Sequence, residues 1–336
     1  MFHTGLHAPG PGLLLNEILA GTETRITRAL AAISEVRPDV ILLLDFDFDA
    51  GLVALGAFSE RLKESGTDLP YSFALPPNSG QPTGIDIDGD GRRNGPADST
   101  GYGEFPGQGG MAVLSRLPIL QGQARDYSLV KWEALPGADL SANEKAWRLP
   151  FSSTAHWLVP LELPDNRILN LLAWHATTPA FDDEEDRNGR RNHAENLFWL
   201  SLLDGVLDLP PPADPFVLLG SANLDPADGD GQRGAIHALL ADPRLQDPLP
   251  RNVAGAERAK SQGGVNLIQK GDPELDTSDW ADASGPGNLR THYVLPSSSL
   301  TVLGSGIYWP AAATDGSGGD AAPARHGMVW VDIAWQ

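Results

Sequence analysis

The stretch LLAWHATTPAFDDEEDRNGRRNH, residues 171–193, predicts how the rest of the chain is organised. Its apolar run ends at Trp174 and His175, and a dense series of polar and charged side chains follows. We interpret the run as a buried strand that carries His175 to a polar loop. Functional side chains usually lie on loops held by a rigid scaffold, so this strand end is the first candidate site. The alternative is a hydrogen-bonded histidine beside a solvated turn.

Helices and short apolar strands alternate on both sides of this stretch. Apolar residues recur at helical spacing over residues 22–37 and again over residues 54–64. The run VILLLDF at residues 40–46 is typical of a strand buried on both faces, with Asp45 near its carboxyl end. The alternation predicts a layered α/β fold. Further strands are expected at residues 111–115, 155–163, 168–175, 216–220, 291–295, 300–304 and 328–334.

A further helix is expected over residues 192–203. Asn192 stands at the predicted N-cap, Glu195 follows in the capping-box position, and Gly205 lies just past the end. No internal repeat or linker divides the chain, so we expect a single domain over residues 1–336, with long loops at 75–110 and 310–325.

The charge balance bears on the class of ligand. The 336 residues include 24 basic and 44 acidic side chains, which gives a formal net charge of -20. A surface with this negative charge repels the phosphate backbone of nucleic acid, so nucleic acid is not expected as a partner. Small ligands and metal ions are favoured instead. There are no cysteines, and the apolar runs are too short to cross a bilayer. Residues 1–6 lack the features of a signal peptide, and the compartment and oligomeric state stay open.

An acidic motif lies in the long loop at residues 75–110. Asp86, Asp88 and Asp90 at alternate positions, followed by Gly91, match the start of a calcium-binding loop. The match weakens at the twelfth position, where Asp98 comes one residue late. A Ca²⁺ site in residues 86–98 and a plain acidic turn are both consistent with this pattern.

Polar residues also follow other predicted strands, as GSANLDP at 220–226, THY at 291–293 and RH at 325–326. Together with HATTPAFDDEEDRNGRRN, the YVLP strand and the final VWVD strand, this order resembles the endonuclease/exonuclease/phosphatase superfamily, the DNase I-like metal-dependent phosphoesterases, and its bacterial members in particular. The resemblance covers nearly the whole chain. It implies a four-layer α/β sandwich of two packed mixed β-sheets flanked by helices.

Four positions of the chain match the family pattern. The resemblance implies that His175 is the histidine of the central strand, Asn223 the phosphate-positioning asparagine of a G-D-x-N segment, and His326 the histidine before the last strand. Asp45 stands where the family has a glutamate that binds a divalent cation. Carboxylates suit Mg²⁺, Mn²⁺ or Ca²⁺ because these ions prefer oxygen ligands.

Other positions depart from the pattern. Ser221 stands at the water-orienting aspartate, and a serine hydroxyl is not a base near neutral pH unaided. His292 replaces the aspartate that orients the last histidine, and Arg325 replaces an aspartate of the metal site. His3 and Gly5 occupy the first-strand positions of an asparagine and an acidic residue. The candidate catalytic residues are therefore His175, Ser221, Asn223, His292 and His326, and Mg²⁺ or Mn²⁺ at Asp45 is doubtful, because Arg325 brings a permanent positive charge.

Three functions remain open on these residues. In the first, metal-dependent phosphoester hydrolysis is weakened or lost and a phosphate- or anion-binding pocket remains, as in a pseudoenzyme. In the second, a rearranged site still hydrolyses phosphomonoesters or phosphodiesters, with Arg325 in place of the metal or with zinc held by Asp45 and the imidazoles of His3, His175, His292 and His326. In the third, the acidic loops act as a calcium-binding surface module.

The basic run after the acidic segment is a candidate phosphate site. Arginine forks near a helix N-terminus bind anions well, so we expect substrate contacts from this run and from the pocket arginine. The alternative is structural pairing with the acidic residues 182–186 directly upstream. The candidate substrate-binding residues are Arg187, Asn188, Arg190, Arg191 and Arg325.

Overall fold

Two mixed β-sheets form the centre of the fold. The computed structural model describes residues 1–137, 149–182, 185–310 and 324–335. The first sheet has the order β1-β2-β4-β3, and the second has the order β11-β8-β7-β6-β5. The strands of the first sheet are β1 (Phe2–Leu6), β2 (Val40–Phe46), β3 (Tyr71–Phe73) and β4 (Gly110–Ser115). Those of the second are β5 (Arg125–Asp126), β6 (Ala155–Glu162), β7 (Ile168–His175), β8 (Phe216–Ser221) and β11 (His292–Pro296).

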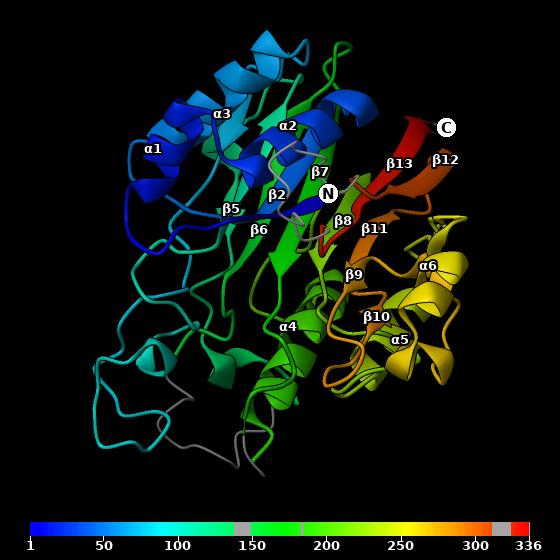
Figure 1. The fold of residues 1–336 in the computed structure, drawn as a ribbon. Helices are drawn as coiled ribbons and strands as arrows, with labels where there is room; N and C mark the ends of the chain where they lie inside the picture. The colour runs from blue at the N-terminus through cyan, green and yellow to red at the C-terminus, as the bar shows by residue number, and fades with distance from the viewer. Residues whose placement is uncertain (138–148, 183–184, 311–323, 336) are drawn as a thin grey trace.

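Two shorter pairs and six helices complete the described elements. The pairs are β9 (Ser278–Asp279) with β10 (Asn288–Leu289), and β12 (Leu300–Tyr308) with β13 (Met328–Trp335). The helices are α1 (Leu13–Ala20), α2 (Thr24–Val36), α3 (Val53–Glu64), α4 (Arg187–Leu203), α5 (Gly234–Ala241) and α6 (Gly255–Gln262). Figure 1 shows α1, α2 and α3 gathered on one side of the strands, with α4 and α5 at the other. Every helix in the described ranges is too short or too polar to traverse a bilayer.

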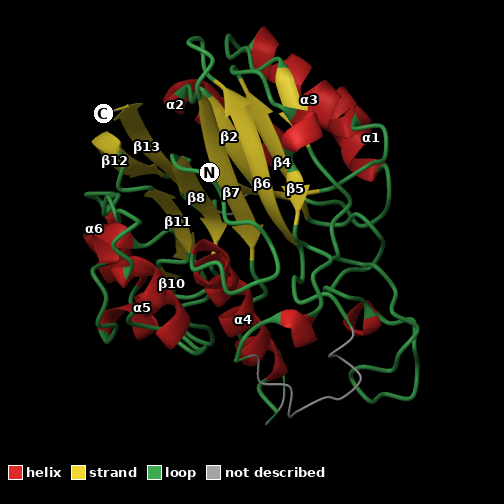
Figure 2. Cartoon of the chain, turned by 180° about the vertical axis from the view of Figure 1, so that it is seen from behind, coloured by secondary structure: helices red, strands yellow, loops and turns green. Residues whose placement is uncertain are grey.

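Alternation along the strands explains the layers. Leu42 and Leu44 of β2 belong to the apolar core between the two sheets, where they meet residues of the second sheet such as Trp157. Their neighbours Ile41 and Leu43 belong to the core under α1, α2 and α3. Successive side chains of a strand point to opposite faces, so a strand apolar at every position is covered on both sides. A third core packs α4 and α5 on the outer face of the second sheet (Figure 2). The predicted four-layer α/β sandwich is confirmed.

The sequence placed most strands correctly and misplaced one important helix. The helix α4 begins at Arg187, not at the predicted Asn192, and its N-cap is Asp186. Asn192 and Glu195 are buried inside the helix, so the predicted capping box is wrong. Their side chains bond loops of the second sheet instead, and this tertiary use outweighs the local capping pattern.

Candidate active site

Strand register brings the predicted catalytic residues together. His175 of β7 is paired with Ser221 of β8, and Ser221 is in turn paired with His292 of β11. His326 precedes β13 and joins these residues from there. Met1 and Val329 exchange backbone hydrogen bonds, and this pairing places His326 beside His3. Residues separated by more than a hundred positions therefore meet at one edge of the second sheet.

Four imidazole rings form a cluster there. The ring centroids of His3 and His326 lie 3.9 Å apart in a stacked arrangement, and those of His3 and His175 lie 5.5 Å apart, edge to face. The rings of His292 and His326 have centroids 5.1 Å apart. We call His3, His175, His292 and His326 the histidine cluster.

A hydrogen-bonded chain runs through the cluster. The hydroxyl Oγ of Ser221 lies 3.1 Å from Nδ1 of His292, and Nε2 of His292 lies 3.0 Å from Nδ1 of His326. Oγ of Ser278 is 3.2 Å from the same His326 nitrogen. Ser221, Ser278 and His292 all have 0% exposure, so the chain is closed off from solvent. Ser278 belongs to β9, a strand that no sequence signal indicated.

Burial keeps these imidazoles neutral. It lowers the pKa of His175 to about 3, with a further contribution from His3. It also lowers the pKa of His3, His292 and His326, the last two well below the ordinary value. Desolvation disfavours the charged form of a base, so at neutral pH the cluster carries no net positive charge. Nδ1 of His3 and Nδ1 of His175 are buried without a hydrogen-bond partner.

Asp45 lies at the end of β2, beside the cluster. Its backbone has φ of 57°, and its Oδ2 lies 2.8 Å from Nδ1 of His7. Burial acts to raise the pKa of Asp45, but the hydrogen bond from His7 offsets it and the pKa stays below the ordinary value. The same bond raises the pKa of His7. No sequence pattern predicts His7 as a partner of Asp45.

The residues at this edge do not fit the family's hard divalent cation. Asp47, the next carboxylate along, accepts backbone N–H groups of Ala8 and Gly109 with its two oxygens. Asp45 is bound to His7, and the chain offers no carboxylate at Ser221 or Arg325. Within the described residues, the histidine cluster and Asp45 do not bring three ligand atoms within 4.8 Å of one another. Mg²⁺ and Mn²⁺ need several converging oxygen ligands, which this edge does not supply.

Helix α4 fixes the loops that follow the two central strands. Nδ2 of Asn192 donates to the carbonyl oxygens of Thr177 and Ala222, at 2.7 Å each. One carboxylate oxygen of Glu195 accepts the backbone N–H of Thr177 at 2.6 Å, and the other accepts from Ser153. The loop after β7 and the loop after β8 are thereby held at the same helix. The NGRRNHAEN run thus has a structural role next to the site.

Arg191 belongs to this framework. Its Nε donates to the carbonyl of Phe151 at 2.8 Å, and its terminal nitrogens donate to carbonyls of Thr100, Pro150 and Ser152. Burial lowers its pKa to about 10, so it stays charged at neutral pH. Four of its five N–H groups are used by backbone carbonyls. These bonds are structural, but they go to backbone carbonyls, whereas the alternative from the sequence was pairing with the acidic residues 182–186.

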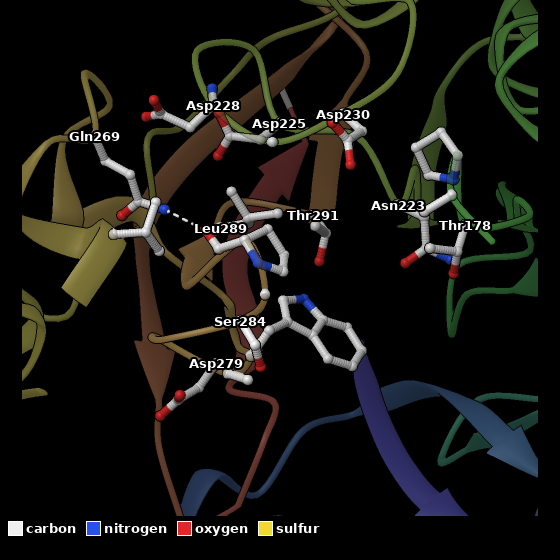
Figure 3. Close-up of a pocket in the computed structure, with 18 of the residues that line it drawn as sticks. Thr178, Asn223, Asp225, Asp228, Asp230, Gln269, Asp279, Ser284, Leu289 and Thr291 are labelled. Atoms are coloured by element: carbon white, nitrogen blue, oxygen red, sulfur yellow. Dashed lines mark hydrogen bonds between the residues drawn. The ribbon is translucent and has the colours of Figure 1, made fainter. Parts of the chain in front are cut away.

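A cavity of about 980 Å³ opens beside the cluster. Arg325, Asn223 and Thr291 line it, and Trp280 of its wall has its ring centroid 5.3 Å from that of His326. In Figure 3, Asp225, Asp228 and Asp230 lie along one side of the cavity, with Asn223 and Thr178 at one end. Arg325 is exposed, and no described carboxylate forms an ion pair with it. The cavity therefore joins the histidine cluster to an acidic wall.

A second cavity, of about 530 Å³, lies on the other side of the loop after β7. Arg187 and Asn188 line it, and Thr178 and Phe181 line both cavities. The amide of Asn188 donates to the carbonyl of Ala180 at 2.7 Å, which ties it to the loop. Arg190 lines neither of the two cavities. Of the predicted substrate-binding residues, Arg325 lines the larger cavity, and Arg187, Asn188 and Arg191 line the smaller one.

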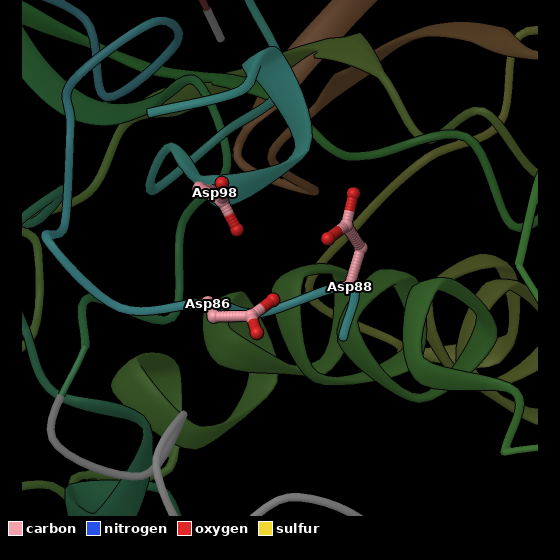
Figure 4. Close-up of side chains that lie close together, drawn as sticks. All are labelled: Asp86, Asp88 and Asp98. Carbon is pink, nitrogen blue, oxygen red and sulfur yellow. The ribbon is translucent and has the colours of Figure 1, made fainter. Parts of the chain in front are cut away.

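The acidic motif forms a compact group away from the cluster. Carboxylate oxygens of Asp86, Asp88 and Asp98 lie within 4.8 Å of one another (Figure 4). Asp90 lies outside this group and accepts the backbone N–H of Arg92 at 2.7 Å. Asp98, which comes one residue after the twelfth position of a calcium-binding loop, thus belongs to this group, and the predicted ligand Asp90 does not.

A two-sheet sandwich with histidines and an asparagine at the strand ends is the architecture of metal-dependent phosphoesterases of the DNase I-like type. The sequence profile of the Endonuclease/Exonuclease/phosphatase family matches residues 15–320, so the chain belongs to this family. Comparison with curated proteins gives no significant sequence match.

Solved structures share the fold. An endonuclease/exonuclease/phosphatase from Beutenbergia cavernae DSM 12333 has a TM-score of 0.56 at 17% identity, over 99% of this chain and 69% of that chain. A family protein from Bacteroides thetaiotaomicron has a TM-score of 0.54 at 10% identity, over 98% and 95% of the two chains. The mannosyl-6-phosphatase of Bacteroides thetaiotaomicron VPI-5482 has a TM-score of 0.52 at 12% identity, over 99% and 98%.

Proposed function

We propose that this protein binds a small phosphorylated ligand beside the histidine cluster and lacks the metal-dependent hydrolysis of its family. The observation that carries the proposal is the buried chain from Ser221 through His292 to His326. Two of its members, Ser221 and His292, occupy positions at which the family resemblance expects aspartates. Neutral groups bonded to one another there neither attract a cation nor accept a proton from water near neutral pH.

Hydrolysis of a phosphoester needs two things, of which this edge provides only a positive charge, that of Arg325. One is a base that orients and deprotonates water, and the other is positive charge on the phosphoryl oxygens. The hydroxyl of Ser221 is inaccessible at 0% exposure. Burial lowers the pKa of His175 to about 3, which makes it a poor base at neutral pH. Binding requires less, because one fixed cation and a few hydrogen-bond donors hold a phosphate.

Arg325 and Asn223 are the proposed phosphate ligands. Both line the larger cavity next to the cluster. The amide of Asn223 donates one hydrogen to the carbonyl of Ala176 at 2.7 Å, which leaves its second N–H for a ligand. Arg187 and Asn188, across the loop, are the proposed contacts for the far end of a longer ligand. The net charge of -20 supports a small ligand over nucleic acid.

An assay series tests the loss of hydrolysis. The purified protein is incubated with a chromogenic phosphomonoester and a phosphodiester, without metal and with Mg²⁺, Mn²⁺, Ca²⁺ or Zn²⁺, while phosphate binding is measured by calorimetry. We expect binding without turnover, and loss of binding in Arg325→Met. Metal-dependent turnover that His175→Ala abolishes would contradict the proposal. The triple variant Ser221→Asp, His292→Asp, Arg325→Asp serves as a positive control, since it restores the carboxylates.

A rearranged, active phosphoesterase is the second candidate. The observation in its favour is that Nδ1 of His3 and Nδ1 of His175 are buried and unpartnered. Neutral imidazole suits Zn²⁺, so modest rotations of these rings would offer ligands to a softer ion. Elemental analysis of the purified protein, together with the Co²⁺ absorption spectrum, separates the two candidates. Stoichiometric zinc in the natural protein that is lost in the His3→Ala variant would favour the active phosphoesterase.

A separate divalent cation site is proposed at Asp86, Asp88 and Asp98. Three converging carboxylates favour Ca²⁺, which accepts oxygen ligands in flexible geometry. Asp98 has 1% exposure, and backbone N–H groups of Ile87 and Gly95 lower its pKa, so it is ionised at neutral pH. We propose that the ion would order the long loop at residues 75–110 rather than take part in chemistry.

A further inference from the structure

The charges around the larger cavity are unevenly distributed. Arg325 stands at the end near the histidine cluster, and Asp225, Asp228 and Asp230 stand along another side (Figure 3). None of these three aspartates forms an ion pair with a described basic side chain. Asp279, which also lines the cavity, differs, because its Oδ2 is bound by Arg258 at 2.7 Å. The cavity thus has a cationic end and an acidic wall that lacks a counter-charge.

A buried carboxyl group, Asp276, is affected by the negative charge of the wall. Asp276 is 9% exposed, and its side chain has no hydrogen-bond or ion-pair partner among the described residues. Burial, and then the like charges of Asp225, Asp228 and other aspartates, raise its pKa to about 8. Carboxylates that are close together and out of water favour a nearby cation or a shared proton. The wall is therefore suited to a positively charged group of a ligand.

Apolar and aromatic side chains face the same space. Phe181 is 93% exposed and has φ of 67°, which is unusual for a bulky residue. Ile268 is 78% exposed, and both line the cavity together with Trp280. An aromatic face attracts an ammonium or alkylated ammonium group, which is also compatible with apolar contact. Carboxylates and aromatic rings together favour such a cation over a strongly hydrated metal ion.

We propose that the cavity receives a phosphorylated amine, with its phosphate at Arg325 and Asn223 and its ammonium group between the acidic wall and Trp280. The inference rests on the proposed function, because the phosphate end is the same. It adds the chemical class of the ligand. A phosphate ester of an uncharged alcohol would bring negative charge to the acidic wall without compensating it, whereas an ammonium group supplies the missing counter-charge.

Matched probes test this inference. Calorimetry at low and at high salt measures the dissociation constants of four probes: inorganic phosphate, phosphoethanolamine, phosphocholine and 3,3-dimethylbutyl phosphate. The last is the isostere of phosphocholine in which a neutral tert-butyl group replaces the ammonium group. We expect phosphocholine to bind about five- to thirtyfold more tightly than its isostere, with a smaller ratio at high salt. Comparison of the two amines shows how much alkylation adds.

Asp230 is the best position for a variant, because it is exposed and has no bonded partner among the described side chains. Asp230→Asn should reduce the ratio between phosphocholine and its isostere and leave phosphate affinity unchanged or higher. Asp230→Lys should invert the ratio. Glu60→Gln on α3 is the matched control, since it removes an exposed carboxylate far from the cavity, and it should change neither value. Melting temperatures verify that each variant is folded.

The outcomes separate the two proposals. A preference for the amine that Asp230→Asn removes supports the inference. Equal affinity for phosphocholine and its isostere, with phosphate still bound, overturns the inference and leaves the proposed function intact. Absence of binding by any phosphate probe overturns both.

Discussion

Nε2 of His292 lies 3.0 Å from Nδ1 of His326, inside the histidine cluster. One imidazole must donate and the other accept, because two neutral rings share a single proton between these nitrogens. The oxygen of Ser221 completes the chain on the far side of His292. The interaction stabilises the fold of this edge, because each buried atom of the chain has a hydrogen-bond partner.

Ser221→Ala should destabilise the protein by about 1–3 kcal/mol, because it leaves Nδ1 of His292 buried without its partner. Urea unfolding gives the free energy. Ser34→Ala is the control, since its hydroxyl bonds Ser65 at the surface, and its effect should stay within about 0.5 kcal/mol. Equal changes in the free energy of unfolding for the two variants would show that the buried bond contributes no more to stability than the bond at the surface.

Arg191 and Arg187 should separate stability from ligand binding. Arg191→Met removes hydrogen bonds to four backbone carbonyls and leaves Glu195 as a buried acid, so a loss of about 3–5 kcal/mol is expected. Arg187→Met should change stability by less than about 0.5 kcal/mol, because Arg187 lines the smaller cavity without a hydrogen bond to a described residue. Unfolding curves and calorimetry with a long phosphodiester measure the two effects. A stable Arg191→Met variant that fails to bind the diester would reverse the assignment.

The stability of the protein should fall as pH rises from 3.8 to about 8 because of Asp276. Burial and neighbouring aspartates raise the pKa of Asp276 to about 8 in the folded state, from 3.8 for an ordinary carboxyl. The folded protein then binds the proton more tightly than the unfolded chain, so this contribution is fully present below pH 3.8 and is lost as pH rises through about 8.

Asp276→Asn should therefore be more stable than the natural protein above pH 8, by on the order of 1–3 kcal/mol, and little different near pH 4. Thermal unfolding between pH 4 and pH 9 measures this. Asp208→Asn, at an exposed position, should give a pH profile parallel to that of the natural protein. Parallel profiles for both variants would contradict the raised pKa.

Calcium should stabilise the protein through Asp98 and not through Asp90. A ligand bound only by the folded state raises the free energy of unfolding, by about 1–3 kcal/mol at concentrations well above its Kd. Melting temperatures with millimolar Ca²⁺ and with a chelator give the shift. Asp98→Asn should lose the shift and Asp90→Asn should keep it, because Asp90 lies outside the carboxylate group. No shift in the natural protein would exclude the site.

The fold was predictable from the sequence because buried strands are identified by apolar runs within a few consecutive residues. Continuous apolar runs such as VILLLDF identify strands buried on both faces, and the structure has β2 at the same residues, Val40–Phe46. The strand β7 also has its predicted bounds, Ile168–His175. Side chains at such strand ends, including His175, were recognisable as site candidates because a polar loop follows an apolar strand.

Only the tertiary structure decided what those side chains do. The bond from His292 to His326 joins residues 34 apart, that from His292 to Ser221 spans 71, and the contact of Asp45 with His7 spans 38. The helix α4 also departs from the local pattern, because Asn192 and Glu195 bind loops that are distant in the sequence. Patterns of polarity along the chain determine which faces are buried, whereas pairing, burial and the resulting pKa of each group depend on which distant residues the folded backbone brings together.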